Sequence, residues 1–353
     1  MERISERQAM LIGAGIIFDA TLISIPAQLL GVAHQDAWLT YLVAGVAVAA
    51  SLWLLSRVGS RFVEVDLYEA LVTRFKWVGR MVVLMYTFFV FFLVCRDLRM
   101  VSDFVNIHLL QKTPLVVISI LVVLVVVFIA RGGVELLARM TELYLPLLFF
   151  VVLILPLLLG KEFELRYYKP IFEHGVGDVL EGGWLAVSYV SEIALLPFFL
   201  SHKVFRLRTG LYGMGIGVFF LTLLIALNIV TLGPHIASRF MYPNIELIRQ
   251  IRITDFLDRF DIAIVSIWLP SIITKIGYLL YICCHGIKRV TPGMSAKQIT
   301  TAVGLVALTC SFWFFENSIQ LIKVNYVWPV VATLFAFVLP LLMFFFLKPK
   351  PMR

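Results

Sequence analysis

The sequence has few charged residues, and this scarcity excludes an ordinary soluble protein. Only 15% of its 353 residues are charged, whereas 61% are hydrophobic. A soluble domain carries about 25% charged residues. The apolar residues come in blocks of roughly 17–25, the length that crosses about 30 Å of hydrocarbon. The composition therefore predicts an all-α polytopic membrane protein.

The sequence also lacks the motifs of common catalytic and metal sites. It contains no Walker motif, HExxH, GxSxG or zinc-like Cys/His spacing, so we predict no enzymatic activity, metal or cofactor. Its four cysteines lie in or beside apolar segments and indicate no disulfide framework. For CCH, at 283–285, packing is favoured over palmitoylation. GMGIG, at 213–217, is predicted to be a helix-packing surface rather than a nucleotide loop.

Ten apolar segments are predicted to span the membrane as one domain. Their approximate limits are 9–31, 37–56, 81–108, 114–130, 141–159, 182–201, 209–233, 262–285, 298–315 and 325–347. The first contains Asp19 and Pro26 and is followed by no small-residue cleavage site, which favours a retained helix over a signal peptide. IELIRQIRITDFLDRF, at 245–260, is predicted to form an amphipathic helix at the membrane surface.

The basic residues predict the orientation. With the N-terminus inside, the inner segments hold 18 Lys and Arg and the outer loops hold 9, while the other three of the 30 lie within spans. Cytoplasmic loops carry the excess of positive charge, so both termini are predicted to be cytoplasmic. The net charge of +8 is attributed to this basic face, and no nucleic-acid partner is predicted.

Three ionisable residues lie near the middle of predicted spans: Asp19, Glu192 and Lys275. Such a residue costs at least about 2.5–3.5 kcal/mol at the bilayer centre, so it normally faces a partner or a wet cavity. Pro26 follows Asp19 and Pro197 follows Glu192, and each proline removes a backbone donor. Two interrupted helices five spans apart predict a five-plus-five inverted repeat, about 9–159 and 182–347, with discontinuous helices 1 and 6 and a midplane ligand site. A purely structural ion pair between Lys275 and either Glu192 or Asp19 is the alternative.

The third span carries Arg96, Arg99 and Asp103 at i, i+3 and i+7, on one helix face, while Asp97 lies off that stripe. Arg99 and Asp103 are spaced to pair at i, i+4. These side chains either snorkel to the outer interface or place Arg96 on the outer wall of a ligand cavity.

The eighth span offers Ser271, Thr274 and Tyr278 beside Lys275. Thr274 and Tyr278 share a face, one turn apart. Their hydroxyls either reach a ligand or bond neighbouring helices.

An ordered series of motifs runs along nearly the whole chain. It consists of ISERQ, ISIP, DAWLTYL, LLQKTPLVVIS, RGGVELLARMTELYLP, SEIALLPFF and YPNIELIRQIRITDFLDRFDIAIVSIWLPSIITK. Together these motifs resemble the B subunits of spore germinant receptors, relatives of the amino-acid/polyamine/organocation transporters.

The resemblance implies a ten-span fold that binds a small germinant, often an amino acid, between spans 1, 3, 6 and 8. It also implies a complex with a membrane-anchored A subunit and a C-subunit lipoprotein in the spore inner membrane. On this basis Lys275 is expected to pair charges, and the expected ligand-binding residues are Asp19, Ala20, Thr21, Ser24, Arg96, Ser188, Glu192, Thr274 and Tyr278.

One departure from the family pattern affects the expected ligand. Before the proline of span 1 the family commonly has Gly-x-Gly, which lets a ligand carboxylate approach backbone amides. Here Asp19, Ala20 and Thr21 take these positions. Asp19 would repel a carboxylate, and it is suited instead to an ammonium group or to Lys275. Three hypotheses stay open: a germinant-sensing subunit, a sodium-independent amino-acid or amine transporter, and a structural subunit whose site has decayed.

Overall fold

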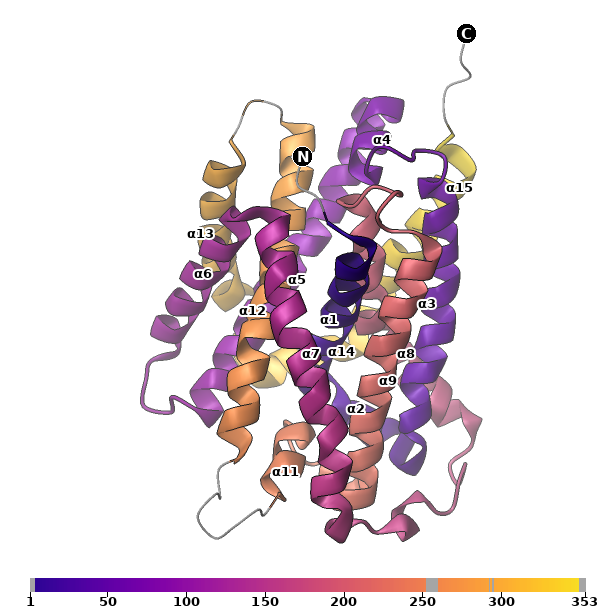
Figure 1. Ribbon diagram of the computed structural model, residues 1–353, viewed down its shortest axis with the longest axis vertical. Helices are drawn as coiled ribbons and strands as arrows, with labels where there is room; N and C mark the ends of the chain where they lie inside the picture. The colour runs from indigo at the N-terminus through magenta and orange to yellow at the C-terminus, as the bar shows by residue number, and fades with distance from the viewer. Residues whose placement is uncertain (1–3, 252–259, 292, 294, 349–353) are drawn as a thin grey trace.

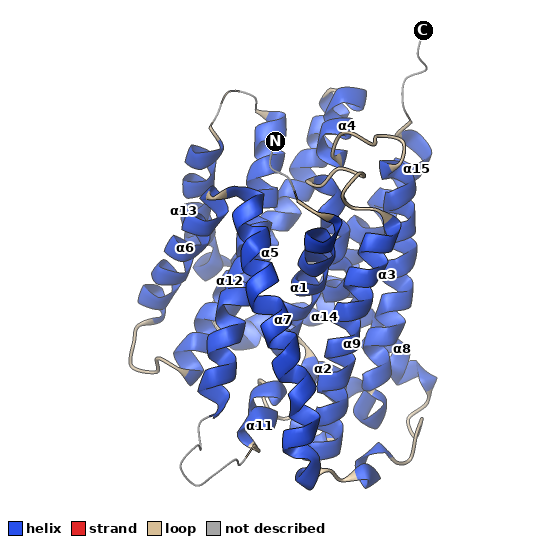
Figure 2. Cartoon of the chain, in the orientation of Figure 1, coloured by secondary structure: helices blue, strands red, loops and turns tan. Residues whose placement is uncertain are grey.

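The computed structural model describes residues 4–251, 260–291, 293 and 295–348. Within these ranges the chain is helical and contains no strand (Figure 2). The long helices run side by side, and the start of α1 and the end of α15 lie toward the upper end of the bundle in Figure 1.

The first half of the chain contains seven α-helices. They are α1 (Glu6–Ser24), α2 (Pro26–Ala33), α3 (Trp38–Gly59), α4 (Leu67–Phe75), α5 (Trp77–His108), α6 (Leu115–Arg131) and α7 (Gly133–Leu159). A short 3₁₀ turn, η1 (His34–Asp36), joins α2 to α3.

The second half contains the remaining described helices. They are α8 (Val176–Val190), α9 (Leu207–Leu232), α10 (Pro234–Ala237), α11 (Pro243–Arg249), α12 (Phe260–Val290), α13 (Ala296–Phe314), α14 (Ser318–Thr333) and α15 (Leu339–Phe346). The 3₁₀ helix η4 (Ser191–Phe198) continues α8, and a π-helical turn (Leu334–Val338) joins α14 to α15.

Eight helical segments of the described chain are long and apolar enough to cross a membrane. Each of the ten predicted spans coincides with a helix, but two of these helices, Leu115–Arg131 and Gln298–Phe314, are shorter apolar stretches. The protein is therefore a multi-pass, all-helical membrane protein. The predicted amphipathic helix begins as α11, and its residues 252–259 lie outside the described ranges.

Local sequence explains several helix starts. Ser5 caps α1 in a capping box with Gln8, and Asn317 caps α14. These side chains satisfy amides that have no partner inside the helix. Pro26 and Pro243 occupy the first positions of α2 and α11, where a missing N–H costs nothing.

The helix α1 lies inside the bundle and packs against α7, α9 and α12. It approaches α9 at the GMGIG sequence. A Cβ atom at Gly213 would stand 2.6 Å from the Met10 carbonyl oxygen, and one at Gly217 would stand 3.1 Å from that of Ala14. The predicted helix-packing surface is confirmed.

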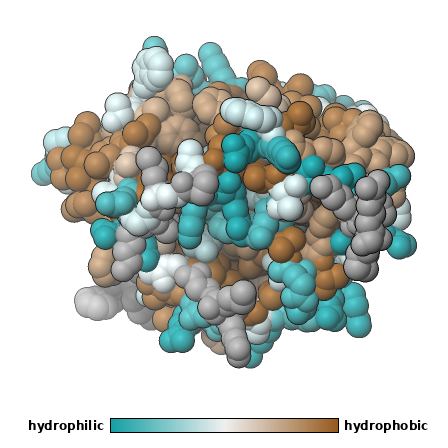
Figure 3. All heavy atoms as spheres, turned by 90° about the horizontal axis from the view of Figure 1, so that it is seen from above, coloured by the Kyte–Doolittle hydropathy of each residue, from teal (hydrophilic) through white to brown (hydrophobic). Residues whose placement is uncertain are grey.

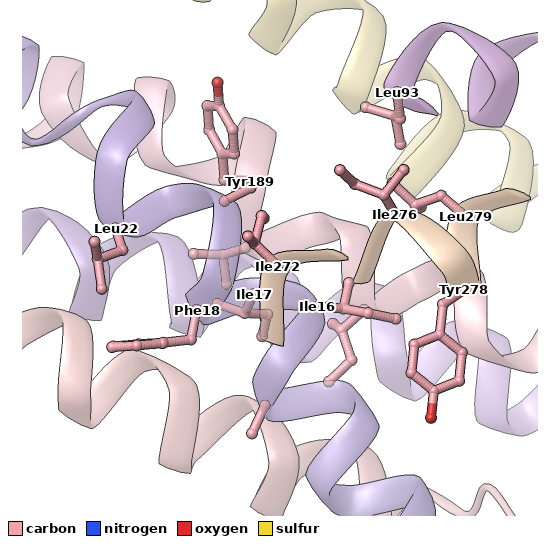
Figure 4. Packing of buried hydrophobic residues seen from close by; sticks show 14 of the residues in the cluster. Ile16, Ile17, Phe18, Leu22, Leu93, Tyr189, Ile272, Ile276, Tyr278 and Leu279 are labelled. Atoms are coloured by element: carbon pink, nitrogen blue, oxygen red, sulfur yellow. The ribbon is translucent and has the colours of Figure 1, made fainter. Parts of the chain in front are cut away.

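Side chains from α1, α5, α8 and α12 meet in the core (Figure 4). Many large apolar side chains remain exposed, including Phe128, Leu157 and Trp313, as expected for a surface that faces lipid. Seen from the upper end of the bundle in Figure 1, hydrophilic side chains lie across the middle of the face among hydrophobic ones (Figure 3). Cys283 and Cys284 are buried, in agreement with predicted packing.

Candidate functional site

The first predicted helix break is present between Ser24 and Pro26. Proline has no N–H, so the carbonyl of Leu22 loses its helical donor. Asn244 of α11 donates to that carbonyl at 2.6 Å, and Asn325 of α14 donates to the carbonyl of Ser24 at 3.1 Å. Two asparagines from distant segments therefore satisfy carbonyl groups at the break.

Asp19 faces α12, and only 2% of it is exposed. Its two carboxylate oxygens accept a hydrogen bond from the Ser271 hydroxyl at 2.9 and 3.0 Å. Its backbone carbonyl accepts from the indole of Trp268 at 3.0 Å. Of the two partners that the structural alternative named for Lys275, Asp19 is not the one it contacts, because the ammonium lies between the carboxylates of Asp97 and Glu192.

The residues that follow Asp19 bond within their own helix. Thr21 donates to the Ile17 carbonyl, and Ser24 donates to that of Ala20. The Ser24 hydroxyl also lies 2.8 Å from Sδ of Met100 on α5.

Four buried charges form a closed cluster at the middle of the bundle: Arg96 and Asp97 of α5, Glu192 of η4 and Lys275 of α12. Arg96 Nη2 lies 2.7 Å from both Asp97 Oδ1 and Glu192 Oε1. Lys275 Nζ lies 2.7 Å from Glu192 Oε2 and 3.0 Å from Asp97 Oδ2. All four side chains are at most 1% exposed. Two cations and two anions thus balance in a region where an unpaired charge is very costly.

The cluster corrects two expectations. Arg96 does not snorkel to the interface: it is buried, and its guanidinium lies 4.5 Å from the centre of the Tyr189 ring. Asp97, which the helical stripe left out, is a full member of the cluster. Lys275 contacts Glu192, one of the two partners that the structural alternative named.

Farther along α5, Arg99 and Asp103 pair at 3.0 Å with i, i+4 spacing, as predicted. Asp103 also accepts from the Ser318 hydroxyl at 2.8 Å, and Arg99 donates to the Glu316 carbonyl at 3.1 Å. Both charged side chains are nearly fully buried, so they too do not snorkel. This network ties α5 to the connection between α13 and α14.

The sixth predicted span changes helix type rather than separating into two α-helices. The α-helix α8 ends at Val190, and Glu192 and Pro197 lie in the 3₁₀ helix η4. A 3₁₀ helix has fewer residues per turn than an α-helix, so the side chains of η4 point in different directions from those that α8 would give them, and Glu192 points to the cluster. Ser188, in the last turns of α8, donates to the Leu185 carbonyl within its own helix.

Two of the predicted hydroxyl groups on α12 have protein partners. Thr274 donates to the Pro270 carbonyl at 2.7 Å, and the Tyr278 oxygen lies 3.3 Å from the Thr141 hydroxyl. The rings of Tyr278 and Tyr189 point in opposite directions (Figure 4). The Tyr278 hydroxyl contacts α7 through Thr141, whereas the Tyr189 hydroxyl contacts α14 through Asn325.

A small cavity, the chamber, lies beside Arg96. Its volume is about 20 Å³, and its walls include Ser24, Arg96, Met100, Tyr189 and Asn325. The chamber therefore joins the break of the first span to α5, α8 and α14. Of the predicted ligand-binding residues, Ser24 and Arg96 line the chamber.

Asn325 links three of these walls. Its carbonyl oxygen accepts from the Tyr189 hydroxyl at 2.8 Å, and its amide donates to the Ser24 carbonyl and, at 3.3 Å, to Gln28 Oε1 of α2. Sequence reasoning missed this residue. The available signal was a polar amide in an apolar helix, where it needs a partner.

A larger cavity, the vestibule, lies at the end of the bundle near the N-terminus. It measures about 660 Å³, and its lining includes Ile4, Phe199, Tyr281 and His285. Within the described ranges, no three His, Cys, Asp or Glu residues are grouped so as to hold a metal ion.

An ionic network of Asp66, His285 and Arg289 lies along the wall of the vestibule. Asp66, in the loop before α4, lies 3.0 Å from His285 Nε2 and accepts from Arg289 at 2.8 Å. Burial acts to raise the pKa of Asp66, but His285, the Glu69 amide and Arg289 outweigh it and hold that pKa below its usual value. The network ties the α3–α4 loop to the end of α12.

Comparisons with known sequences agree on one family. A family model described as "Spore germination protein" matches residues 3–320. Putative spore germination protein YfkT of Bacillus subtilis (strain 168) is 32% identical over 350 residues, covering 99% of this chain and 98% of that protein. Spore germination protein KB of the same organism is 22% identical over 327 residues, covering 89% and 86%.

Solved transporters share the fold. MHP1, a nucleobase-cation-symport-1 family transporter in a closed conformation with bromovinylhydantoin bound, superposes with a TM-score of 0.68 at 13% identity, covering 94% of this chain and 76% of that chain. A manganese transporter of Eremococcus coleocola superposes with a TM-score of 0.59 at 11% identity, covering 96% and 78%. At these identities the likeness concerns the fold alone.

Proposed function

The chain belongs to the spore germination protein family, and from this premise we propose that it is the B-type membrane subunit of a germinant receptor. It senses a small nutrient, such as an amino acid. The observation that carries this proposal is a broken helix beside a buried charge cluster and a small chamber with several polar side chains in its walls, in the middle of a transporter fold.

The proposed architecture is ten spans in a five-plus-five inverted repeat, about 9–159 and 182–347. Ten helical segments at the predicted positions and the likeness to transporters support it. Both termini would be cytoplasmic, in the inner membrane of the spore. The start of α1 and the end of α15 lie toward the same end of the bundle, which supports placing both termini on one side of the membrane (Figure 1).

The ligand would bind near the midplane, between helices 1, 3, 6 and 8. Candidate contacts are the segment from Asp19 to Ser24, with Ala20 and Thr21, together with Arg96, Ser188, Glu192, Thr274 and Tyr278. The position of Ser24 and Arg96 on the chamber favours the side of the site that faces α14.

Sensing would work by a population shift. A ligand that binds one arrangement of the broken helix better than another increases the population of that arrangement. Partner A and C subunits would detect the change. The α3–α4 loop and the end of α12, held together by Asp66, are a suitable surface at the vestibule end.

Spore germination tests the proposal. The gene is deleted in a strain that lacks its other germinant receptors, so that redundancy cannot mask a loss, and is then restored as wild type or as Asp19→Asn. We expect the wild-type gene to restore germination with at least one nutrient. Restoration with no nutrient, although the protein is present in the membrane, would contradict a sensing role. If Asp19→Asn restores the full response, Asp19 has only its structural bond to Ser271.

A sodium-independent transporter of amino acids or amines is the second candidate. Lys275 favours this function, because its ammonium group lies between two carboxylates in the core. A fixed cation in that position would take the place of a coupling sodium ion. Uptake into proteoliposomes separates the two functions. Concentrative flux without sodium supports transport, and binding without flux supports sensing.

A further inference from the structure

A groove lies on the membrane-facing surface between α5, α12 and α13, which pack against one another. Its volume is about 470 Å³. Short side chains on α13 leave space beside the bulky ones on α5, and Phe88 is 65% exposed. The side chains that form its two long walls are Leu84, Phe88 and Phe91 of α5 and Ala302, Val303 and Val306 of α13.

The walls of the groove suit a hydrocarbon chain and not a polar ligand. Thr87 and Cys283 are the two polar side chains in its lining. The Thr87 hydroxyl donates to the Val83 carbonyl at 2.8 Å, and the Cys283 thiol lies 3.8 Å from the Thr87 carbonyl oxygen. Both donors therefore have acceptors, and a polar group that entered the groove would lose its hydrogen bonds to water without replacement.

One end of the groove lies close to the end of the bundle where α4 is located (Figure 1). The helix α5 begins there at Trp77, and Leu84 follows seven residues later, about 10 Å along the axis. Arg80 precedes Leu84 by one turn on the same face of α5. The α5 wall of the groove is therefore continued by a cation toward the end of the helix.

This end of α5 carries basic side chains without anionic partners. Arg74, Lys76 and Arg80 form no ion pair in the part of the chain that the structure describes, and the buried Nε atoms of Arg74 and Arg80 have no acceptor there. The acidic Glu69 of α4 is bonded by Arg289 at 2.7 Å instead. The local charge is therefore positive and suited to an anion.

Trp77 marks the depth of these cations. It is 76% exposed, and the Arg80 guanidinium lies 5.8 Å from the centre of its ring. Exposed tryptophans gather at the level of lipid headgroups, and basic groups between membrane helices bind anionic headgroups. A headgroup beside Arg80 would leave its acyl chain at the depth of Leu84 and Phe88.

We propose that the groove and the basic end of α5 form a binding site for one anionic phospholipid. Its acyl chain lies between α5 and α13, and its phosphate lies beside Arg80. In the proposed orientation this lipid belongs to the cytoplasmic leaflet. The site is separate from the charge cluster and the chamber, and it does not depend on germinant sensing.

The length of the groove favours a lipid over a protein helix. Its α5 wall runs from Leu84 to Phe91, about 10 Å. A transmembrane helix of a partner or of a second copy would pack along much of the roughly 30 Å of hydrocarbon. Such a helix also gives no account of the unpaired cations at one end.

The test titrates the purified full-length protein in detergent with phosphatidylglycerol or phosphatidylcholine of identical acyl chains. Native mass spectrometry counts the bound lipids, gives an apparent Kd for each and detects dimers. Arg80→Gln removes the charge, and Arg208→Gln is its control at an exposed position near the start of α9. Val306→Trp fills the groove, and Val46→Trp is its control on α3, where Val46 is 77% exposed.

We expect the wild type to bind phosphatidylglycerol at least about tenfold more tightly than phosphatidylcholine. Arg80→Gln should weaken phosphatidylglycerol binding about fivefold and leave phosphatidylcholine binding unchanged, because one cation is lost. Val306→Trp should weaken the binding of both lipids by about tenfold, because the acyl chain loses its apolar contacts. Both control variants should bind like the wild type.

Equal affinity of the wild type for the two lipids would overturn the inference. So would equal effects of Arg80→Gln and Arg208→Gln, or unchanged lipid binding in folded Val306→Trp. A dimer that Val306→Trp abolishes, without preference for either lipid, would show that a second copy occupies the groove. If Arg80→Gln does not fold, Lys76→Gln at an exposed position makes the same test of charge, and unchanged phosphatidylglycerol binding would then count against the site. The assay contains no germinant, so its outcome is distinct from that of the germination experiment.

Discussion

Replacement of Lys275 by methionine tests whether the four buried charges act as one balanced unit. The change leaves Asp97 and Glu192 with a single guanidinium between them. Lys275 lies 2.7 and 3.0 Å from these two carboxylates, whose side chains are fully buried. Removal of one partner from a buried ion pair costs about 3–5 kcal/mol, because the remaining charge is uncompensated. We expect a loss of free energy of unfolding in this range.

The second variant restores the balance. Glu192→Gln in the Lys275→Met background leaves Arg96 and Asp97 as one cation and one anion. Because replacement of a whole buried pair is often close to neutral, the double variant should be more stable than Lys275→Met by about 2 kcal/mol or more. The free energy of unfolding is measured by denaturation with SDS in mixed micelles.

Lys288→Met is the matched control. It removes a cation from the same helix at an exposed position, where a substitution usually changes stability by no more than about 0.5 kcal/mol. If Lys275→Met costs no more than this control, or if the Glu192→Gln change adds a further loss instead of a recovery, the cluster is not a balanced unit.

Three further predictions follow from contacts elsewhere. Asp66→Asn should lower the melting temperature at pH 7. The pKa of the Asp66 carboxyl is lower in the folded than in the unfolded protein, so its contribution to stability is present above about pH 4 and is lost as the pH falls further. A difference in melting temperature between wild type and variant that stays constant from pH 7 to 3 would contradict this. Gly213→Ala should destabilise the protein by about 1–3 kcal/mol, because the new Cβ would stand 2.6 Å from a backbone oxygen. Gly215→Ala has open space around it and should be neutral or stabilise the protein by up to about 1 kcal/mol. Equal changes in the free energy of unfolding for the two variants would refute the close contact. Asn244→Ala should lower the free energy of unfolding by about 1–3 kcal/mol, because the Leu22 carbonyl loses its hydrogen-bond donor. Unchanged thermal stability would show that another group replaces the amide.

Much of the fold is readable in the sequence because the bilayer imposes a length on each span. Helices occur at all ten predicted apolar segments, and in two of them, α6 and α13, the apolar stretch is shorter. The break at Pro26 is equally local, since it depends only on a missing N–H. The i, i+4 pair of Arg99 and Asp103 follows from helix geometry.

The partners of the buried groups were less predictable. Asp19 was predicted to suit an ammonium group or Lys275; in the structure it accepts from Ser271, while Lys275 contacts Asp97 and Glu192. Asp97 seemed to lie off the functional face, yet it contacts both cations of the cluster. A helix inside a bundle has neighbours on several sides, so one polar stripe does not identify every buried polar contact.

The sequence by itself determined the all-helical membrane class, the approximate position of the apolar segments, the first helix break and the presence of charges that need partners. These features depend on composition and on interactions within a few residues. Only the tertiary structure decided which charges meet, that Asn244 and Asn325 satisfy the broken helix, and that the chamber opens beside Arg96. Such contacts join residues far apart in the chain, and their distances depend on how the helices pack.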